Sequence, residues 1–261
     1  MSRWNRCSAI WSRAASGPLV TLALHLYRRI MRRGRVIGLL ALAAVPGLVF
    51  WLSAFDAPES DLTTLYTDVL ASVGYTFAIA ALILTTATLR DERDSGTLPY
   101  IYMRPIARTN MAAQSIASGT GAALVIGVGG WIASAVALLA VGGDIQAAIP
   151  SLSLFVAAGI GYAAIFVPLG YLVPRALLFG LGYILVVETI LAFAVEGLAQ
   201  ISIWRISLSI YAGLEDGFGE VATQAMTPVT PGVWGGVAKL AGVLVIGLVV
   251  LTWALRKRDA L

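Results

Sequence analysis

The sequence RDERDSGTLPYIYMRPIAR, residues 90–108, is a polar segment between two long apolar runs. Residues 78–89 (AIAALILTTATL) precede it, and residues 121–143 (GAALVIGVGGWIASAVALLAVGG) follow it closely. Apolar runs of this kind are typical of membrane spans, so the polar segment is predicted to connect two spans. The segment contains, in order, a charged cluster, Gly96-Thr97, an apolar-aromatic stretch and Arg104-Pro105. This order favours a binding surface for another protein. The alternative is a solvated charged loop.

The composition is typical of a membrane protein. Of the 261 residues, 59% are hydrophobic and 12% are charged, whereas soluble domains carry about 25% charged residues. The net charge is +4, and most of the 18 Lys and Arg residues flank apolar runs, which indicates membrane topology rather than nucleic-acid binding. Cys7 is the single cysteine, so no intrachain disulfide is expected. About 35 residues precede the first apolar run, too many for a cleaved signal peptide.

Six membrane spans are predicted, each close to the ~20 apolar residues that a bilayer requires. They cover residues 36–55, 69–89, 113–141, 151–173, 176–196 and 235–255. The first loop is acidic, the polar segment carries four Arg, residues 142–150 carry only Asp144, and the next turn carries Arg175. Because basic loops stay in the cytoplasm, the polar segment and both termini are predicted to be cytoplasmic. The predicted fold class is an all-α membrane protein with a six-span domain over residues 36–255.

The remaining parts of the chain flank this domain. Residues 1–17 and 256–261 are predicted to be cytoplasmic tails. Residues 18–35 place leucines at helical spacing and arginines elsewhere, which predicts an amphipathic helix in the membrane interface, with Leu toward acyl chains and Arg toward phosphates. A simple extension of the first span is the alternative.

The fifth loop, residues 197–234, is the largest external segment. Its apolar residues Ile203, Ile206, Ile210 and Leu214 recur at helical spacing. Trp204, Tyr211 and Phe218 supply aromatic side chains of the kind that lie at membrane interfaces. We therefore expect a short helix that lies in the outer leaflet or dips into it, rather than a free loop.

The available residue types exclude several kinds of active site. His25 is the only histidine, which excludes an HExxH zinc site or a Ser-His pair within the membrane. The only lysines are Lys239 and Lys257, and neither follows the glycine that a P-loop requires. No Cys, His and carboxylate cluster has metal-ligand spacing. We therefore expect no catalytic residue, no metal and no bound cofactor in this chain, which is not expected to be an enzyme.

Glu188 is an ionisable residue predicted to lie about twelve residues into the fifth span. A carboxylate near mid-membrane costs a few kcal/mol on insertion scales and faces a partner or a water-filled path. One interpretation is a cation or proton site. The favoured interpretation is a structural pair, or a protonated Glu188 that is hydrogen-bonded to a neighbour. Lys239, near the outer end of the sixth span, is the expected partner because its long stem can close part of the gap.

The polar segment closely resembles the signature of the type-2 ABC exporter permeases. That family carries an acidic and basic cluster, Gly-Thr-Leu, an apolar stretch and Arg-Pro-Ile-x-Arg between its second and third spans. The matching residues here are Glu92, Gly96, Thr97, Leu98, Arg104, Pro105, Ile106 and Arg108. The interfacial helix, the six spans, the internal termini and the enlarged last external loop extend the resemblance over nearly the whole chain. Gln114 departs from the family pattern, because the family often has Lys at this position near the start of the third span.

The resemblance implies that residues 90–108 hold a coupling helix that docks into a separate ABC ATPase subunit. ATP and Mg²⁺ are then bound by that partner, and the chain pairs with a second permease subunit as a homodimer or heterodimer in the cell inner membrane. Gly96 permits a sharp bend, and Arg104-Pro105 ends the helical run. The predicted docking residues are Glu92, Arg93, Gly96, Thr97, Leu98, Tyr100, Ile101, Tyr102, Arg104, Pro105 and Arg108.

Other functions compete with an ATP-driven exporter. A secondary transporter or ion channel would use Glu188, and a membrane assembly subunit would carry out no transport. An intramembrane enzyme is disfavoured by the lack of histidine. No residue selects the cargo, although the apolar lining expected from spans two and five favours a hydrophobic one. Glu92 and Arg93 are expected to pair either with the spans or with the ATPase.

Overall fold

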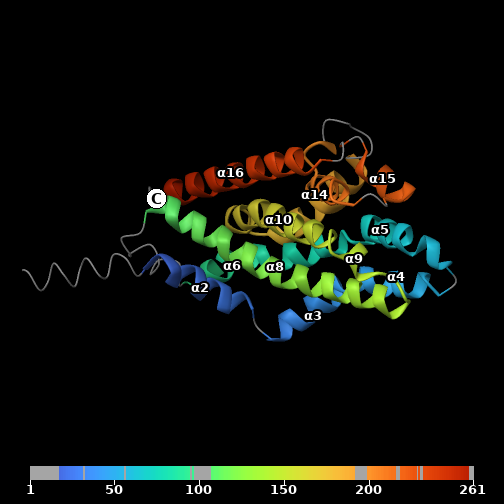
Figure 1. Cartoon of the computed structure of the whole chain (residues 1–261). Coiled ribbons are helices and arrows are strands. Elements are labelled where there is room, and N and C mark those ends of the chain that lie inside the picture. Colours follow the sequence, from blue (N-terminus) through green and yellow to red (C-terminus); the bar gives the residue numbers. More distant parts are fainter. Residues whose placement is uncertain are drawn as a thin grey trace, which may run out of the picture.

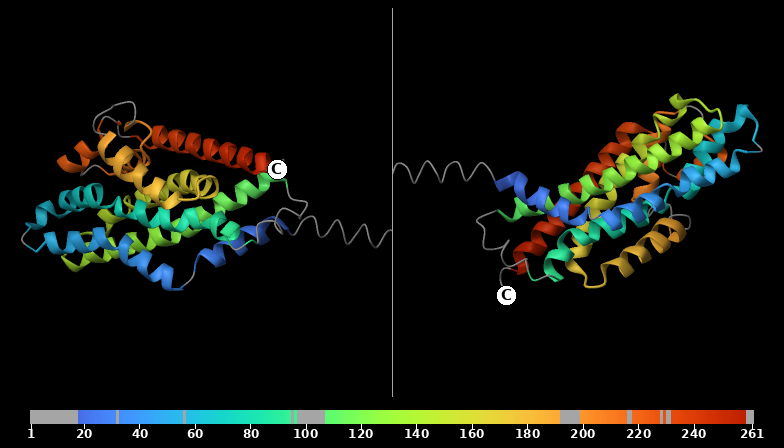
Figure 2. Two further views of the ribbon diagram at one scale, coloured as in Figure 1. Left: turned by 180° about the vertical axis from the view of Figure 1, so that it is seen from behind. Right: turned by 90° about the horizontal axis from the view of Figure 1, so that it is seen from below.

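The computed structural model describes residues 18–31, 33–55, 57–94, 96, 107–191, 199–215, 218–227, 229 and 232–258. Over these ranges the chain is helical and contains no strand. The long helices run side by side, with α2 (Pro18–Ile30), the start of α8 (Arg108–Ala140) and the end of α16 (Val233–Arg258) at one end of the bundle (Figure 1). The views of Figure 2 show the same arrangement. We call this the segment end, because the polar segment joins helices there.

Further helices complete the bundle between α2 and α16. In chain order they are α3 (Arg33–Ala43), α4 (Val45–Ser53), η1 (Glu59–Asp61), α5 (Leu62–Val73), α6 (Thr76–Asp94), α9 (Ile145–Ala148), α10 (Leu152–Leu172), α11 (Ala176–Gly182), η2 (Tyr183–Leu191), α14 (Ile203–Ala212) and α15 (Glu220–Met226). Helix α10 lies at the centre and packs against α6, α8, α14 and α16.

The helices that could cross a membrane agree only in part with the six predicted spans. Within the described ranges, four are long and apolar enough: Gly34–Ser53, Arg108–Ala140, Ile145–Leu172 and Val233–Lys257. A fifth is the pair α5 and α6, bent by 44°. The predicted fifth span is described only as far as residue 191, and its apolar helix Ala176–Ile190 is shorter than a full span. The membrane protein class is confirmed, and the count of six spans stays a prediction.

The second span differs from the straight segment predicted at residues 69–89. It begins earlier, at Leu62, and breaks after Val73 before α6 continues to Asp94. Gly74 allows this bend, because a side chain there would overlap the indole ring of Trp204 and the carbonyl of Leu70. The sequence pattern missed the break because apolar residues continue across it on both sides.

Helix α2 is separate from α3, since it ends at Ile30 and α3 begins at Arg33. Its Leu22 and Leu26 are buried in a cluster with Leu89 of α6 and Met111 of α8. The expectation that these leucines face acyl chains is therefore wrong, because helices of the same chain cover them. The membrane depth of α2 stays a prediction.

The predicted helix in the fifth loop is confirmed as α14, but its environment differs from the prediction. Every residue from Ile203 to Tyr211 is buried. The helix packs between α10 and α16, so its apolar residues contact protein rather than the outer leaflet. A pattern of apolar residues at helical spacing reports a buried face and does not distinguish lipid from protein as its cover.

Candidate functional site

The polar segment begins as the last turn of α6, which includes Arg90, Asp91, Glu92 and Arg93. The N–H of Gly96 donates to the carbonyl of Arg93 over 3.1 Å, and Gly96 has a φ of +68°, the left-handed conformation that glycine adopts readily after a helix. The sharp bend predicted at Gly96 is therefore present. The other end of the segment is described from Ala107, and α8 begins at Arg108.

Seven of the predicted docking residues lie outside the described residues. They are Thr97, Leu98, Tyr100, Ile101, Tyr102, Arg104 and Pro105. Their role as contacts for a partner stays a prediction.

Glu92 is held inside this chain by the N-terminal helix. Its side chain is 1% exposed, and Arg29 of α2 donates to its Oε1 over 2.7 Å. His25 Nε2 lies 3.4 Å from the same oxygen. Arg29 also donates through Nη2 to the carbonyl of Asp91 over 3.1 Å. A buried carboxylate requires such partners, so Glu92 fastens the end of α6 to α2.

Two further contacts join the same turn of α6 to its neighbours. Arg35 of α3 donates to Asp91 Oδ2 over 3.2 Å. Arg93 donates through Nη1 to the carbonyl of Tyr171, at the end of α10, over 3.0 Å. Of the two expectations for Glu92 and Arg93, pairing with helices of this chain is the one observed. Both residues therefore position the segment, and their contact with an ATPase stays a prediction.

Glu188 lies on η2, a π-helix over Tyr183–Leu191. The wider turn of a π-helix brings residues five apart onto one face, and the hydroxyl of Tyr183 donates to Glu188 Oε1 over 2.9 Å. The hydroxyl of Thr189 donates to the carbonyl of Ile184, also five residues earlier, over 3.2 Å. The π-helical geometry thus supplies Glu188 with its first partner.

The other three partners of Glu188 come from the start of α14. The hydroxyl of Ser202 donates to Oε2 over 2.7 Å, and the backbone N–H groups of Ile203 and Trp204 donate over 3.0 and 3.2 Å. Ser202 also accepts from the N–H of Arg205 over 3.3 Å. The first N–H groups of a helix have no intrahelical partner and carry partial positive charge, so Glu188 caps α14 from a different helix.

The expected pair of Glu188 with Lys239 is wrong. The Lys239 ammonium contacts Oε1 of Gln200 instead. The start of α14 meets the carboxylate, and its N–H groups take the place expected for the ammonium. The favoured structural interpretation of Glu188 is consistent with this, because four donors of the protein converge on its two oxygens.

Asp68 tethers α15, a contact that the sequence does not predict. Its Oδ1 accepts from the N–H of Ala222 at the start of α15 over 2.8 Å. The neighbouring hydroxyl of Thr67 accepts from the N–H of Gly219 over 3.1 Å. A carboxylate seven residues into a helix gives no sequence signal for capping a helix about 150 residues away.

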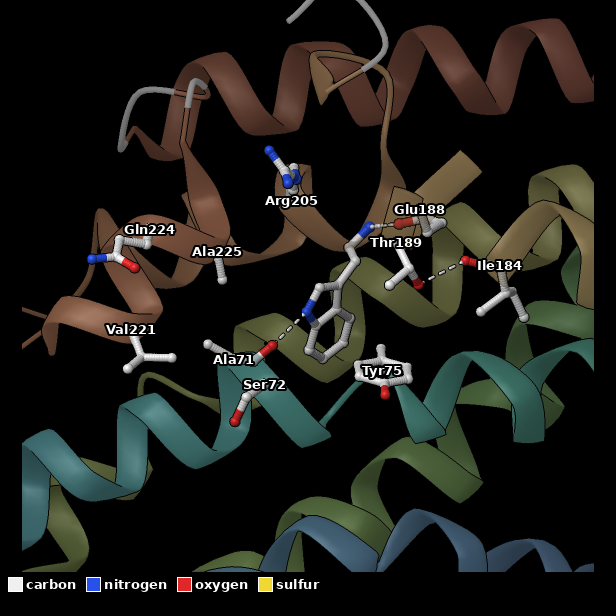
Figure 3. A pocket seen from close by; sticks show the side chains of 11 residues that line it. Ala71, Ser72, Tyr75, Ile184, Glu188, Thr189, Arg205, Val221, Gln224 and Ala225 are labelled. Carbon is white, nitrogen blue, oxygen red and sulfur yellow. Dashed lines mark hydrogen bonds between the residues drawn. The ribbon is translucent and has the colours of Figure 1, made fainter. Parts of the chain in front are cut away.

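A cavity of about 300 Å³ lies beside Glu188 (Figure 3). Ala71, Ser72 and Tyr75 line it from the bend of the second span; the other lining residues belong to η2, α14 and α15. The indole N–H of Trp204 donates to the carbonyl of Ala71 across it over 3.0 Å. The cavity is mainly apolar, so the chemistry it offers is burial of an apolar group beside an aromatic ring.

Arg205 is a buried cation near this cavity. Its guanidinium donates to the carbonyl of Thr227, which ties α14 to the end of α15. Burial lowers the pKa of Arg205, and the charge of Glu188 opposes that shift. No group of three or more His, Cys, Asp or Glu residues could hold a metal ion within the described ranges.

Comparison with known proteins identifies one family. A family model described as "ABC-2 family transporter protein" matches residues 31–190. The match runs from just before α3 to the end of η2, so it includes the polar segment and Glu188 but not α14, α15 or α16. None of the curated proteins matches the chain.

Proposed function

Because the chain belongs to the ABC-2 family of transporter proteins, it is a permease subunit of an ABC transporter, and we propose that it exports its substrate as a dimer driven by separate ATPase subunits. Residues 90–108 form the docking segment in this proposal. The family implies an ABC ATPase partner and a multi-pass membrane protein. The direction of transport, the dimer, the cytoplasmic termini and the inner membrane location are parts of the proposal.

The contacts that anchor the polar segment to the helices of this chain support the proposed coupling, in addition to the family match. An element that transmits force from an ATPase must be fixed to the helices that it moves. The last turn of α6 is bonded to α2 through Glu92, to α3 through Asp91 and to α10 through Arg93. A displacement of the segment would therefore move three neighbouring helices together with α6.

At the end of the bundle away from the polar segment, the second and fifth spans are in turn connected to α15 and α14, which are external helices in this proposal. Asp68 of α5 holds α15, and Glu188 of η2 holds α14. In the proposed mechanism, ATP-driven movement of α6 is passed through the bend at Gly74 to α5 and so to the external helices. ATP and Mg²⁺ are bound by the partner, and this chain contributes movement rather than catalysis.

A pull-down tests the docking step. The full chain, with Leu98 and Tyr102 both replaced by Asp, is co-expressed with its ATPase, and the amount of ATPase retained in detergent is compared with wild type. We expect the double variant to lose the ATPase while still inserting into the membrane, because charge replaces two apolar anchors. Asn110→Asp is the matched control, since this exposed residue of α8 adds a charge just beyond the segment. Unchanged retention by the double variant would refute docking through the segment.

A flux measurement separates the exporter from its alternatives. Vesicles that contain the chain and its ATPase should lose transport when ATP is depleted and keep it when the proton gradient collapses. A secondary transporter that uses Glu188 gives the opposite result, and a membrane assembly subunit gives ATP hydrolysis without flux. The secondary transporter has the weaker support, because the oxygens of Glu188 already accept four hydrogen bonds from the protein.

A further inference from the structure

A second cavity, of about 250 Å³, lies at the segment end between α3, α6 and α11. Its charged lining residues are Arg35, Arg90 and Asp91, and Ile83, Ala87 and Leu177 form an apolar wall. Arg90 and Asp91 begin the docking segment, but the proposed docking makes no use of the cavity that they line. The cavity is separate from the one beside Trp204, with which it shares no lining residue.

Two of the three charged residues that line the cavity are arginines. Arg35 and Arg90 contribute two guanidinium groups, and Asp91 contributes one carboxylate. Arg35 uses Nη1 to bind Asp91 over 3.2 Å, and both side chains are 33% exposed. A guanidinium has five N–H donors in a fork that matches a phosphate group, so Arg35 can hold Asp91 and an anion together. A phosphodiester is an anion of this kind.

The apolar wall continues from the charges toward the interior of the bundle. Ile83, Ala87 and Asp91 follow one another at four-residue spacing on α6, and Arg90 lies three residues after Ala87, so all four lie toward one face of the helix. At 1.5 Å per residue, Ile83 lies roughly 10 Å deeper than Arg90 along the helix. Leu177 closes the wall from α11 and is 40% exposed. The cavity is thus cationic at its outer end and apolar further in.

Helices α3 and α11, which contribute to the lining of the cavity, also carry exposed apolar side chains. Ile37 of α3 is 68% exposed, and Leu178 and Phe179 of α11 are 71% and 62% exposed. Side chains of this size and exposure on a membrane protein are suited to contact with acyl chains rather than water. A ligand can therefore reach the cavity from the bilayer.

We propose that this cavity binds an anionic phospholipid from the membrane leaflet at the segment end. Arg35 and Arg90 bind the phosphate, and an acyl chain lies along Ile83, Ala87 and Leu177. Basic pockets between membrane helices on the cytoplasmic side bind anionic lipid headgroups in this way. The lipid would contact the turn of α6 that Asp91 and Glu92 fasten to α3 and α2. This proposal does not depend on what the protein transports.

Native mass spectrometry of the full chain in a mild detergent tests the proposal. The probes are phosphatidylglycerol, phosphatidylcholine of the same chain length, and glycerol 3-phosphate, which presents the phosphate without acyl chains. We expect one phosphatidylglycerol per chain to be retained in preference to the other two. In the double variant Arg35→Gln with Arg90→Gln, we expect the affinity for phosphatidylglycerol to fall at least about tenfold, because each arginine contributes to anionic lipid binding.

Two variants keep the test independent of folding. Arg175→Gln removes an exposed arginine close in sequence to Leu177 but outside the cavity, and it should retain phosphatidylglycerol like wild type. Leu177→Trp keeps both cavity arginines and fills the apolar wall, and it should lose the lipid. Equal retention of phosphatidylcholine, or retention by the double arginine variant at the wild-type level, overturns the proposal. Glycerol 3-phosphate binding as tightly as phosphatidylglycerol also overturns it, since the site would then be for free phosphate.

Discussion

Ser202 donates a 2.7 Å hydrogen bond to the carboxylate of Glu188, and this contact fixes the start of α14 to η2. The same carboxylate accepts from the N–H groups of Ile203 and Trp204. Helix α14 is thereby capped by a residue of η2, in addition to its own N-cap Ser202. The carboxylate in the predicted fifth span thus holds α14 in place.

The main effect of replacing Glu188 should be a loss of protein stability rather than a direct effect on transport. Hydrogen bonds to a charged group contribute roughly 1.5–3 kcal/mol each, so we expect Glu188→Ala to lower the free energy of unfolding by about 3 kcal/mol. Glu188→Gln should cost less, because its amide oxygen can still accept while its NH₂ faces other donors. Thermal unfolding in detergent measures both variants, and ATPase retention should be unchanged wherever the variant folds.

Thr189→Val is the matched control for Glu188. It removes a hydroxyl that bonds only within η2, to the carbonyl of Ile184, and should change the unfolding temperature little. If Glu188→Gln unfolds like wild type yet abolishes transport, Glu188 acts as an ion site and the structural interpretation fails.

Replacing Asp68 should loosen α15 and leave the rest of the bundle intact. The Oδ1 of Asp68 accepts from the N–H of Ala222, and losing a helix N-terminal acceptor costs about 0.5–2 kcal/mol. We expect Asp68→Ala to accelerate amide hydrogen exchange in Glu220–Met226. Asp144→Ala is a matched control, because Asp144 caps α9 by accepting from the N–H of Gln146 over 2.9 Å. Exchange in α15 that is unchanged by Asp68→Ala contradicts the tether.

The sequence predicts the helices of this protein better than their contacts. Runs of apolar residues locate α8, α10 and α16 to within a few residues at most ends, since the bilayer imposes their length. The partners of Glu188 escape prediction because two of them are backbone N–H groups, which every residue but proline carries. Lys239 was the expected partner because it is a charged side chain, and charge alone does not place it within reach.

The pairing of Arg29 with Glu92 should be required for stability at the segment end. Glu92 is 1% exposed and Arg29 is 24% exposed, so removing Arg29 leaves a buried carboxylate without its main partner. We expect Arg29→Ala to lower the free energy of unfolding by about 3 kcal/mol. The exchanged pair Arg29→Glu with Glu92→Arg should recover part of this loss. Denaturant unfolding of the purified chain measures each variant.

Arg28 offers a control on the same helix. Its side chain is exposed, so Arg28→Ala removes the same charge from α2 without touching Glu92, and surface changes of this kind usually stay within about 0.5 kcal/mol. Equal losses for Arg28→Ala and Arg29→Ala would show that the charge of α2, rather than the pair, stabilises the segment end.

Replacing Gly96 should impair coupling through the backbone rather than through packing. Gly96 has a φ of +68°, and a Cβ there would have no neighbour within 4 Å. A β-branched residue such as valine is strained in this conformation by about 1–2 kcal/mol. We expect Gly96→Val to shift the course of the chain after α6 and reduce transport per ATP hydrolysed. Gly96→Asn should be milder, because asparagine tolerates left-handed backbone.

Gly142 provides the matched control for Gly96. It is the other described glycine with positive φ, at +86°, and a Cβ there would also have open space. Gly142 follows α8 at the end of the bundle opposite the polar segment, so Gly142→Val carries the same backbone cost without touching the docking segment. Coupling, measured as substrate moved per ATP hydrolysed in vesicles, should fall for Gly96→Val and stay at the wild-type value for Gly142→Val. Equal effects of the two variants would mean that loss of stability, and not the bend after α6, limits coupling.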